Sequence, residues 1–221
     1  MLEEYISKLK PEVLKLFKED SSGHDITHLE RTMNLALFLQ KYEGGDEIVI
    51  GIAAFLHDVH RILQNQAGKF VSPKDSLWKV KEILNVINLS EEQLNKILHA
   101  IEYHEEYNWN NPNNKENDIN TLILQDADNL DAIGAIGIGR TFQYGGAHNV
   151  PMYDNTKPLN MENDYSEEKG DDESTIHHFY HKLFKLGENM NTNKAKEIAE
   201  NRTKYMKEFV QEFLAEWKGE K

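Results

Sequence analysis

The most constraining feature of this sequence is the apolar segment DEIVIGIAAFLHD, residues 46–58. Asp46 stands where a helix N-cap belongs, and the residues after it are apolar on every side of the helix that they would form. A helix without a polar face lies in the middle of its domain, because each of its sides must be covered. The segment nevertheless ends in His57 and Asp58, and a buried carboxylate needs a cation or strong hydrogen-bond donors. The pair is therefore either a core histidine beside an aspartate that pairs with an arginine, or part of a cation site.

Helical periodicity accounts for almost every other segment. Helices are expected from Ile26 to about Tyr42, from Pro73, and from the capping box that begins at Ser90. No segment has a convincing strand pattern, and no linker or internal repeat divides the chain. The sequence therefore predicts an all-α fold in which residues 1–221 form a single domain, a compact helical bundle.

A long polar loop is expected before the last helices. Residues 145–173 are polar, acidic and interrupted by Gly and Pro, and loops of this length in compact domains often serve as lids or binding segments. A helix is expected after Thr175, followed by a long amphipathic helix that closes the chain. Its apolar residues recur at helical spacing and are expected to be core: Ala195, Ile198, Tyr205, Phe209, Phe213 and Trp217.

Composition narrows the classes of partner. The formal net charge is −13 with Lys and Arg scattered along the chain, so no nucleic-acid partner is expected. The absence of Cys excludes disulfides and thiolate metal sites and fits a reducing compartment. No apolar stretch approaches the length of a membrane span, so we expect a cytoplasmic protein without a membrane partner. An anionic substrate would need a local cation to reverse the field of this acidic chain.

Three aspartates interrupt a second apolar helical stretch, TLILQDADNLDAIGAIGIGRTFQYGG, residues 121–146: Asp126, Asp128 and Asp131. They repeat the problem posed by Asp58, and one shared cation answers both. Two imidazoles and two carboxylates would then come from three helices: His28, His57, Asp58 and one of these aspartates. Such ligands suit a divalent ion such as Mn, Fe, Co, Zn or Ni. Helical geometry puts Asp126 and Asp128 on different sides and leaves open which of them faces the ion.

His28 lies near the start of the helix expected from Ile26 to about Tyr42. It heads an apolar stripe with Leu35 and Phe38 that ends at Tyr42, so its side chain should point inward. Asp25 stands at the N-cap position of the same helix, and capping explains it without any chemistry.

These residues resemble the motif of a known family. His28, then His57-Asp58, then an aspartate in DADNLDA is similar to the H…HD…D pattern of the HD-domain metal-dependent phosphohydrolases. The likeness to a bacterial single-domain branch of that family extends over nearly the whole chain. It implies an HD-domain helical bundle with a metal-binding core at about residues 20–145, on which C-terminal helices at 174–217 pack. It also implies that Asp128 is the metal ligand and that Asp126 orients a ligand histidine or a water.

The resemblance implies hydrolysis of a phosphate ester or anhydride with one divalent metal ion: Mn, Fe, Co, Ni, Zn or Mg. Asp58 is expected to hold the metal and to accept a proton from the attacking water. His104 is the expected general acid, His60 is an expected substrate contact, and His24 could also touch a phosphate.

Phosphate oxygens away from the metal require cationic partners. The candidates are Arg61, Arg140 and Lys182. His178 lies near Lys182 in a stretch that resembles the family's His-Phe-x-x-Lys-Leu. The alternative for His178 and Lys182 is a solvated helix face. His177 and His181 share a helical face but lack a third ligand, so no metal is expected there. The GAIGIG segment lacks the glycine spacing of a dinucleotide-binding motif, and its small residues are expected to allow close helix packing.

The function expected from the sequence is a metal-dependent phosphohydrolase acting on small phosphorylated substrates, foremost nucleotides, as a nucleoside triphosphate pyrophosphohydrolase or a nucleotidase. Two alternatives stay open. One is a cyclic or linear dinucleotide phosphodiesterase with a two-metal centre, in which Asp58 bridges and His104 is an added ligand. The other is a catalytically silent module that binds a nucleotide. The oligomeric state is not indicated.

Overall fold

Helices form all the regular structure in the part of the chain that the computed structural model describes, residues 1–18, 24–106, 116–160 and 173–221. This confirms the predicted all-α class. The first seven are α1 (Leu2–Leu16), α2 (Ile26–Glu43), α3 (Glu47–Leu56), α4 (Val59–Ala67), α5 (Pro73–Leu84), α6 (Glu91–Tyr103) and α7 (Ile119–Asp131). They are followed by α8 (Gly134–Ala147), α9 (Thr175–His178), the π-helical turn η2 (Phe179–Leu183), α10 (Phe184–Glu188) and α11 (Asn193–Lys218).

Helix α3 lies at the centre of the N-terminal helices, as its apolar sequence predicts. Every residue at 49–56 is buried, and α3 packs against α1, α2, α6 and α7. Its first turn is capped by Asp46, whose side chain accepts hydrogen bonds from the amides of Ile48 and Val49. At the other end, His57 caps the helix and Asp58 directly precedes α4. The His57-Asp58 pair thus sits at a helix junction inside the core.

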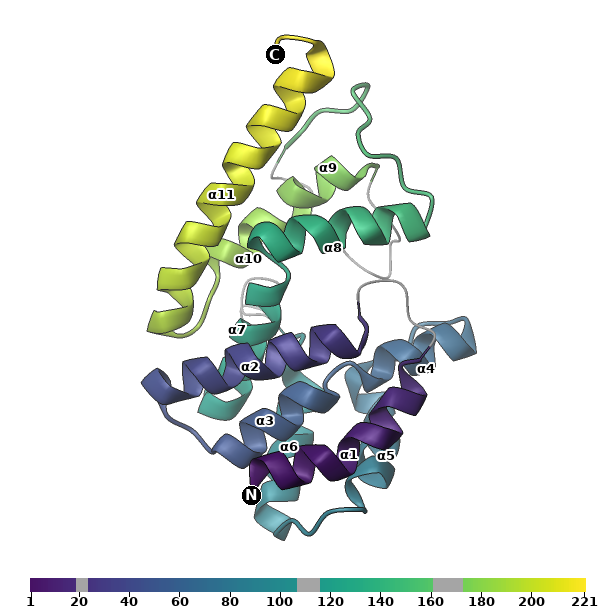
Figure 1. Cartoon of the computed structure of the whole chain (residues 1–221), viewed down its shortest axis with the longest axis vertical. Coiled ribbons are helices and arrows are strands. Elements are labelled where there is room, and N and C mark those ends of the chain that lie inside the picture. The colour runs from purple at the N-terminus through teal and green to yellow at the C-terminus, as the bar shows by residue number, and fades with distance from the viewer. Residues whose placement is uncertain (19–23, 107–115, 161–172) are drawn as a thin grey trace.

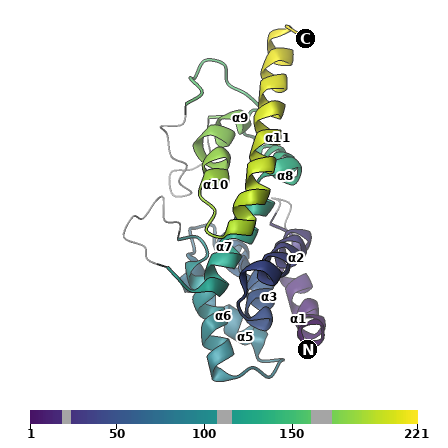
Figure 2. The same cartoon turned by 90° about the vertical axis from the view of Figure 1, so that its left-hand side faces the viewer.

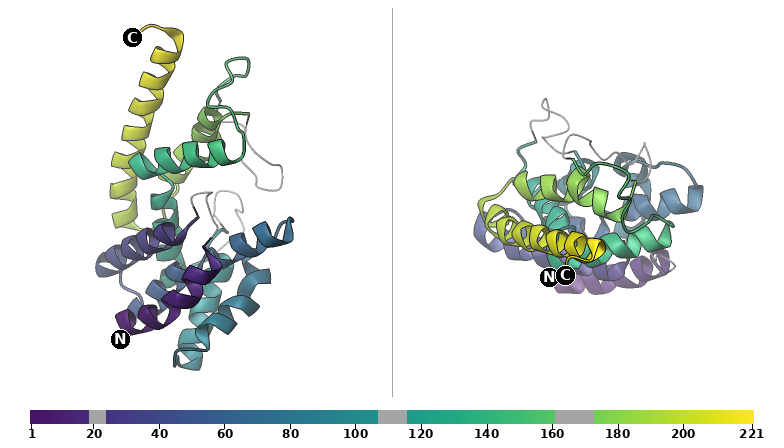
Figure 3. Two further views of the ribbon diagram at one scale, coloured as in Figure 1. Left: turned by 45° about the vertical axis from the view of Figure 1, so that its right-hand side comes forward. Right: turned by 90° about the horizontal axis from the view of Figure 1, so that it is seen from above.

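The helices form two groups that α7 joins. Figure 1 shows α1–α6 in the lower half of the molecule and α8–α11 in the upper half, with α7 running between them, and Figure 2 shows the same division from the side. Helix α7 contacts α2, α3 and α6 of the lower group and α8, α10 and α11 of the upper group. Helix α11 crosses α8 in contact, as Figure 3 shows. Residues on α7 can therefore organise a site together with either group.

The apolar stretch at 121–146 is two helices, where the sequence indicates one continuous segment. The break follows Asp131, and Gly134 has φ +78°, a conformation that favours glycine. A Cβ added at Gly134 would lie 2.9 Å from Cγ of Arg202, and one added at Gly137 would lie 2.2 Å from the carbonyl oxygen of Ala132. Close packing at these glycines is as predicted, but it serves a sharp turn between α7 and α8.

The buried face of α11 differs from the predicted aromatic stripe. The buried residues are Ala195, Ala199, Thr203, Met206 and Val210. Tyr205 is 53% exposed and Trp217 is 45% exposed, so these two positions of the predicted core stripe are wrong. The face of α11 that packs on α8 and α10 is the neighbouring one, and Ile198, Phe209 and Phe213 are partly buried at its edge.

The middle of the predicted polar loop, residues 161–172, lies outside the described residues, as do residues 107–115 after α6. Over the described residues, no helix is long and apolar enough to cross a membrane.

Candidate metal centre

Four side chains from α2, the α3–α4 junction and α7 meet in the core and are called here the ligand quartet: His28, His57, Asp58 and Asp128. Nε2 of His28 lies 3.2 Å from Nε2 of His57 and 3.2 Å from Oδ2 of Asp58. Oδ1 of Asp128 lies 3.4 Å from Nε2 of His28 and 3.6 Å from Nε2 of His57. Nε2 of His57 is also 3.6 Å from Oδ1 of Asp58. Each of the two carboxylates therefore lies within 3.6 Å of both histidines.

The spacing of these atoms fits a divalent ion. Nitrogen and oxygen ligands about 2.0–2.2 Å from an ion lie about 3 Å apart at octahedral angles and about 3.4 Å apart at tetrahedral angles. The separations of 3.2–3.6 Å are centred on the tetrahedral value. Both histidines and Asp58 are almost fully buried, while the side chain of Asp128 is 20% exposed. The quartet is thus open to substrate and water on the Asp128 side.

The two imidazoles are oriented by their other ring nitrogens. Nδ1 of His57 donates to the carbonyl oxygen of Ala54 at 2.9 Å, and Nδ1 of His28 donates to Oδ2 of Asp131 at 2.7 Å. A proton held at Nδ1 leaves the lone pair of the neutral ring on Nε2. Both Nε2 atoms are therefore available as metal ligands, and this is the tautomer that metal-binding histidines commonly show.

Asp131 is itself fixed by two arginines. Arg31 donates to both of its oxygens, from Nε to Oδ1 at 2.8 Å and from Nη2 to Oδ2 at 2.9 Å, and Arg140 donates to Oδ2 at 3.0 Å. Burial opposes the charge of Asp131, but His28 and Arg31 lower its pKa to about 2. Arg140, a substrate contact in the sequence prediction, thus supports a residue that orients a ligand. Sequence reasoning considered Asp131 only as one of three possible metal ligands and not as a partner of His28, although it lies three positions after Asp128 on the same helix.

The charges of the quartet favour a cation between its members. Burial opposes the charged form of His57, but the carboxylates of Asp58 and Asp128 outweigh it and raise the pKa of His57 to about 9. Burial likewise opposes the charges of Asp58 and Asp128, yet His57 beside them holds the pKa of each carboxyl below its ordinary value. Without a metal ion, a proton on His57 supplies the positive charge beside the two carboxylates.

Asp126 lies away from the quartet, contrary to the role expected for it. Its Oδ1 accepts from the amide and side chain of Asn191, and its Oδ2 accepts from the amide and hydroxyl of Thr192. Thr192 is the N-cap position of α11, so Asp126 anchors the start of that helix. The carboxylate that orients His28 is Asp131 instead, because Asp126 points about 200° around α7 from Asp128, toward the start of α11.

His24 extends the quartet toward solvent. Its Nδ1 donates to Oδ2 of Asp58 at 2.8 Å, and its side chain is 27% exposed. Burial lowers the pKa of His24, although Asp58 acts against that effect. Asp58 is thereby connected through one hydrogen bond to a histidine that reaches the surface.

A second cluster lies beside the quartet and consists of His60, His104 and Glu105. Nε2 of His60 is 3.5 Å and Nε2 of His104 is 4.0 Å from Oε1 of Glu105. Arg61 donates from Nη2 to the same Oε1, and its Nε lies 3.8 Å from Oδ1 of Asp58. His104 also converges with His57 and Asp58, so the two clusters are adjacent. Glu105 was missed from the sequence, although it directly follows His104.

His104 does not suit the general-acid role predicted for it. Its Nδ1 donates to the carbonyl oxygen of Ile101 at 2.7 Å, and burial lowers the pKa of His104 to about 4. At neutral pH its Nε2 therefore carries a lone pair, and a general acid must carry a proton.

Two of the predicted substrate contacts, His178 and Lys182, belong to the upper group of helices. His178 ends α9 and Lys182 lies in η2, and both are half-buried, while Phe179 and Leu183 between and after them are core as predicted. His177 and His181 are both buried with ring centroids 5.8 Å apart. Neither belongs to a group of converging metal ligands among the described residues.

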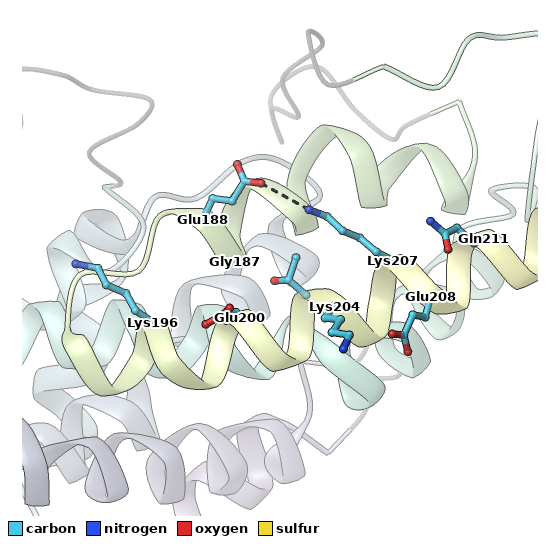
Figure 4. A pocket seen from close by; sticks show the side chains of 9 residues that line it. Gly187, Glu188, Lys196, Glu200, Lys204, Lys207, Glu208 and Gln211 are labelled. Carbon is cyan, nitrogen blue, oxygen red and sulfur yellow. Dashed lines mark ion pairs between the residues drawn. The ribbon is translucent and has the colours of Figure 1, made fainter.

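A hollow on the surface lies apart from this chemistry. It has a volume of about 500 Å³ and runs along α10 and α11. Figure 4 shows that lysines and glutamates alternate around it, with Lys207 facing Glu188 at 3.8 Å. Its charges are balanced, and none of the predicted ligands lines it.

Comparison with known proteins gives this geometry a family. The model of the HD domain matches residues 25–133, a range that contains the whole ligand quartet. YpgQ of Bacillus subtilis, an uncharacterized protein, is 30% identical over 200 residues, which cover 90% of this chain and 87% of YpgQ. The chain belongs to the HD-domain family. The predicted resemblance is thus confirmed.

Solved structures extend the match to nearly the full chain. An HD-superfamily hydrolase of Bacillus thuringiensis is 36% identical with a TM-score of 0.73, over 99% of each chain. A protein of Lactobacillus plantarum is 32% identical with a TM-score of 0.78, over 99% of this chain and 100% of the other. YpgQ in complex with ADP is 28% identical with a TM-score of 0.63, over 92% and 94%. This HD-domain protein therefore has the HD-superfamily hydrolase fold.

Proposed function

We propose that this HD-domain protein is a divalent-metal-dependent phosphohydrolase whose substrates are nucleotides, foremost a nucleoside triphosphate pyrophosphohydrolase or a nucleotidase. The observation that carries the proposal is the convergence of two imidazole nitrogens and two carboxylates at 3.2–3.6 Å in the core. The structure of YpgQ with ADP supports a nucleotide as the ligand class.

The ligand quartet would hold one ion, with Mn, Fe, Co, Ni, Zn and Mg as the candidates. Imidazole and carboxylate together favour the transition metals among them. A divalent ion in this position lowers the pKa of a bound water and offsets the charge of phosphoryl oxygens. Its entry is through the partly exposed Asp128 side, which is also where a phosphate could approach.

Asp58 and His24 are the residues placed to move a proton. Asp58 can accept a proton from the attacking water at Oδ1, because its Oδ2 already accepts from Nδ1 of His24. His24 is partly exposed, so the pair offers a route by which a proton can leave the buried centre. This role suits an attacking water better than the leaving group, which lies on the far side of the phosphorus.

Arg61 is the cation best placed to contact a phosphate beside the quartet. Its guanidinium lies between Asp58 and Glu105 with 14% of its side chain exposed, and guanidinium groups bind phosphate oxygens through paired hydrogen bonds. His178 and Lys182 are kept as further contacts to the remote part of the substrate. Both are half-buried on the segment where a π-helical turn interrupts the helix, and such turns occur frequently at functional sites.

The test is a substrate panel with identified products. Metal-free protein is reloaded with Mn²⁺ and given nucleoside triphosphates, diphosphates and monophosphates, together with cyclic and linear dinucleotides. We expect a nucleoside triphosphate to give a monophosphate and pyrophosphate, or a monophosphate to give a nucleoside and phosphate. His57→Ala should abolish the activity, and His99→Ala, which changes a partly exposed histidine on α6, should not.

Other outcomes would replace the proposal. Hydrolysis confined to dinucleotides would favour the phosphodiesterase alternative, which gains some support from the convergence of His104 with His57 and Asp58. Nucleotide binding without turnover of any substrate by the metal-loaded protein would indicate the silent binding module.

A further inference from the structure

The second cluster contains two buried ring nitrogens that lack hydrogen-bond partners. Nε2 of His60 and Nε2 of His104 are each inaccessible to solvent and make no hydrogen bond among the described residues. Both side chains have no exposed surface. Buried polar atoms are almost always satisfied, so two adjacent exceptions need a physical explanation.

Both rings present a lone pair to the cluster. Nδ1 of His60 donates to the carbonyl oxygen of His57 at 3.1 Å, and Nδ1 of His104 donates to that of Ile101 at 2.7 Å. A carbonyl oxygen only accepts, so each Nδ1 carries the proton, and Nε2 of each neutral ring carries the lone pair. The rings lie with centroids 5.4 Å apart in the core, and Nε2 is the nitrogen that each ring turns toward Glu105.

The third member of the cluster is a carboxylate. Oε1 of Glu105 is 3.5 Å from Nε2 of His60 and 4.0 Å from Nε2 of His104, which is too far for good hydrogen bonds. Two nitrogen lone pairs and one anionic oxygen thus converge, and all three ligand atoms lie within 4.8 Å of one another. Arg61 balances the charge of Glu105, but the two Nε2 lone pairs have no hydrogen-bond partner, and a cation between the three ligand atoms would give them one.

We propose that His60, His104 and Glu105 form a second divalent cation site beside the ligand quartet. Two imidazoles and one carboxylate suit Mn²⁺, Fe²⁺, Co²⁺ or Zn²⁺, with water or substrate oxygens completing the coordination. The site is distinct from the two-metal arrangement expected as an alternative from the sequence, because His60 and Glu105 supply ligands in addition to His104.

Arg61 is compatible with a cation in this position. It donates to Oε1 of Glu105, and a carboxylate offers about four lone-pair sites, so Glu105 can keep Arg61 and bind an ion at once. Glu105 is also the most exposed member of the cluster, with 23% of its side chain accessible, so it can shift to close the coordination. Its exposure provides the path by which an ion enters.

The role of this ion rests on the proposed function. The Nδ1 proton of His104 is held by the carbonyl oxygen of Ile101, so the charge on a departing phosphate needs another partner. A cation held by the second cluster, adjacent to the quartet through His104 and Asp58, would provide it. The ion bound by the quartet would face the attacking water, and the second ion would face the leaving oxygen.

The test is the metal stoichiometry of the full chain, measured without nucleotide. Metal-free protein is dialysed against increasing Mn²⁺ and the bound metal is counted by elemental analysis. We expect two ions per chain, the second bound more weakly. His60→Ala and Glu105→Gln should each bind one ion and keep the helical circular dichroism spectrum. His99→Ala, a matched change on the helix that carries the end of the cluster, should bind two.

The outcomes separate this proposal from the proposed function. A wild-type chain that saturates at one ion, or a Glu105→Gln chain that still binds two, would overturn the second site and leave the hydrolytic function standing. Two ions that fall to one in both variants would support the site even if no nucleotide is hydrolysed. If inorganic phosphate binds the metal-free protein and His60→Ala abolishes that binding, the cluster is an anion site and the proposal is wrong.

Discussion

His28 donates a hydrogen bond from Nδ1 to Oδ2 of Asp131 at 2.7 Å, and this bond determines which nitrogen of His28 faces the ligand quartet. The same carboxylate receives Arg31 through two hydrogen bonds and Arg140 through a third. An imidazole that donates to a carboxylate is a stronger ligand through its other nitrogen. We therefore expect the metal affinity of the quartet to depend on residues that lie outside it.

Asp131→Asn should weaken metal binding without abolishing it. The amide has nearly the same shape, but it lacks the charge that polarises His28 and pairs with Arg31. Loss of such a partner typically costs about 10–100-fold in metal affinity. The measurement is the dissociation constant of the tighter Mn²⁺ ion. An unchanged constant would mean that Asp131 serves only to hold α2 against α7.

The neighbouring aspartates of α7 should separate into a ligand and an anchor. Asp128→Asn should lose the tightly bound ion, because Oδ1 of Asp128 lies within 3.6 Å of both quartet histidines. Asp126→Asn should keep the ion and instead lower the free energy of unfolding by about 1–3 kcal/mol, since it breaks buried hydrogen bonds to Thr192. Elemental analysis and urea denaturation measure the two effects. Loss of metal from Asp126→Asn alone would reverse the assignment.

The choice between these aspartates shows where sequence reasoning reached its limit. Helical periodicity selects a ligand only when one face of a helix is buried, and α7 is buried on nearly all sides, including both Asp126 and Gln125. The family motif, which places Asp128 after His57-Asp58, supplied what periodicity could not. The wholly apolar run of α3 was decisive in the same way, because a helix with no polar face has only one place in a fold.

Other features depended on tertiary contacts that no local pattern records. His28 is buried as predicted, but it shares its inward face with Leu29, Thr32, Ala36 and Leu39, while Phe38 is 39% exposed and Tyr42 is 61% exposed. A stripe shows which residues point the same way, and neighbouring helices decide which stripe is covered. The orienting role of Asp131 was missed for a related reason, since its partner Arg31 lies 100 positions away in the chain.

Arg140→Met should act through the metal and not through the substrate. The change removes one hydrogen bond to Asp131 and leaves the two from Arg31, so metal affinity should fall by less than in Asp131→Asn. At saturating metal, KM for the best nucleotide should stay within about twofold of wild type, since no ground-state contact to substrate is lost. Steady-state kinetics decide this. A large rise in KM with unchanged metal affinity would restore Arg140 as a phosphate contact.

The affinity of the quartet for metal should rise with pH, because the ion must displace a proton from His57. Burial opposes the imidazolium, but Asp58 and Asp128 raise the pKa of His57 to about 9, so the metal-free ring is largely protonated near neutral pH. Nδ1 keeps its proton for Ala54, and the displaced proton is the one on Nε2. Affinity should therefore increase by up to about tenfold per pH unit and level off above about pH 9.

Calorimetry with less than one equivalent of Mn²⁺, in two buffers of different ionisation enthalpy at about pH 7.5, measures the protons released by the tighter ion; we expect about one. His99→Ala should release the same number, because His99 pairs with Glu116 away from the quartet.

The direction of the pKa shift of His57 also determines how the stability of the metal-free protein depends on pH. A pKa raised from 6.5 to about 9 contributes stability that is complete below pH 6.5 and is lost as the pH rises through about 9. Urea midpoints of metal-free protein that increase across this window, together with no proton release, would show that His57 is neutral before the metal binds.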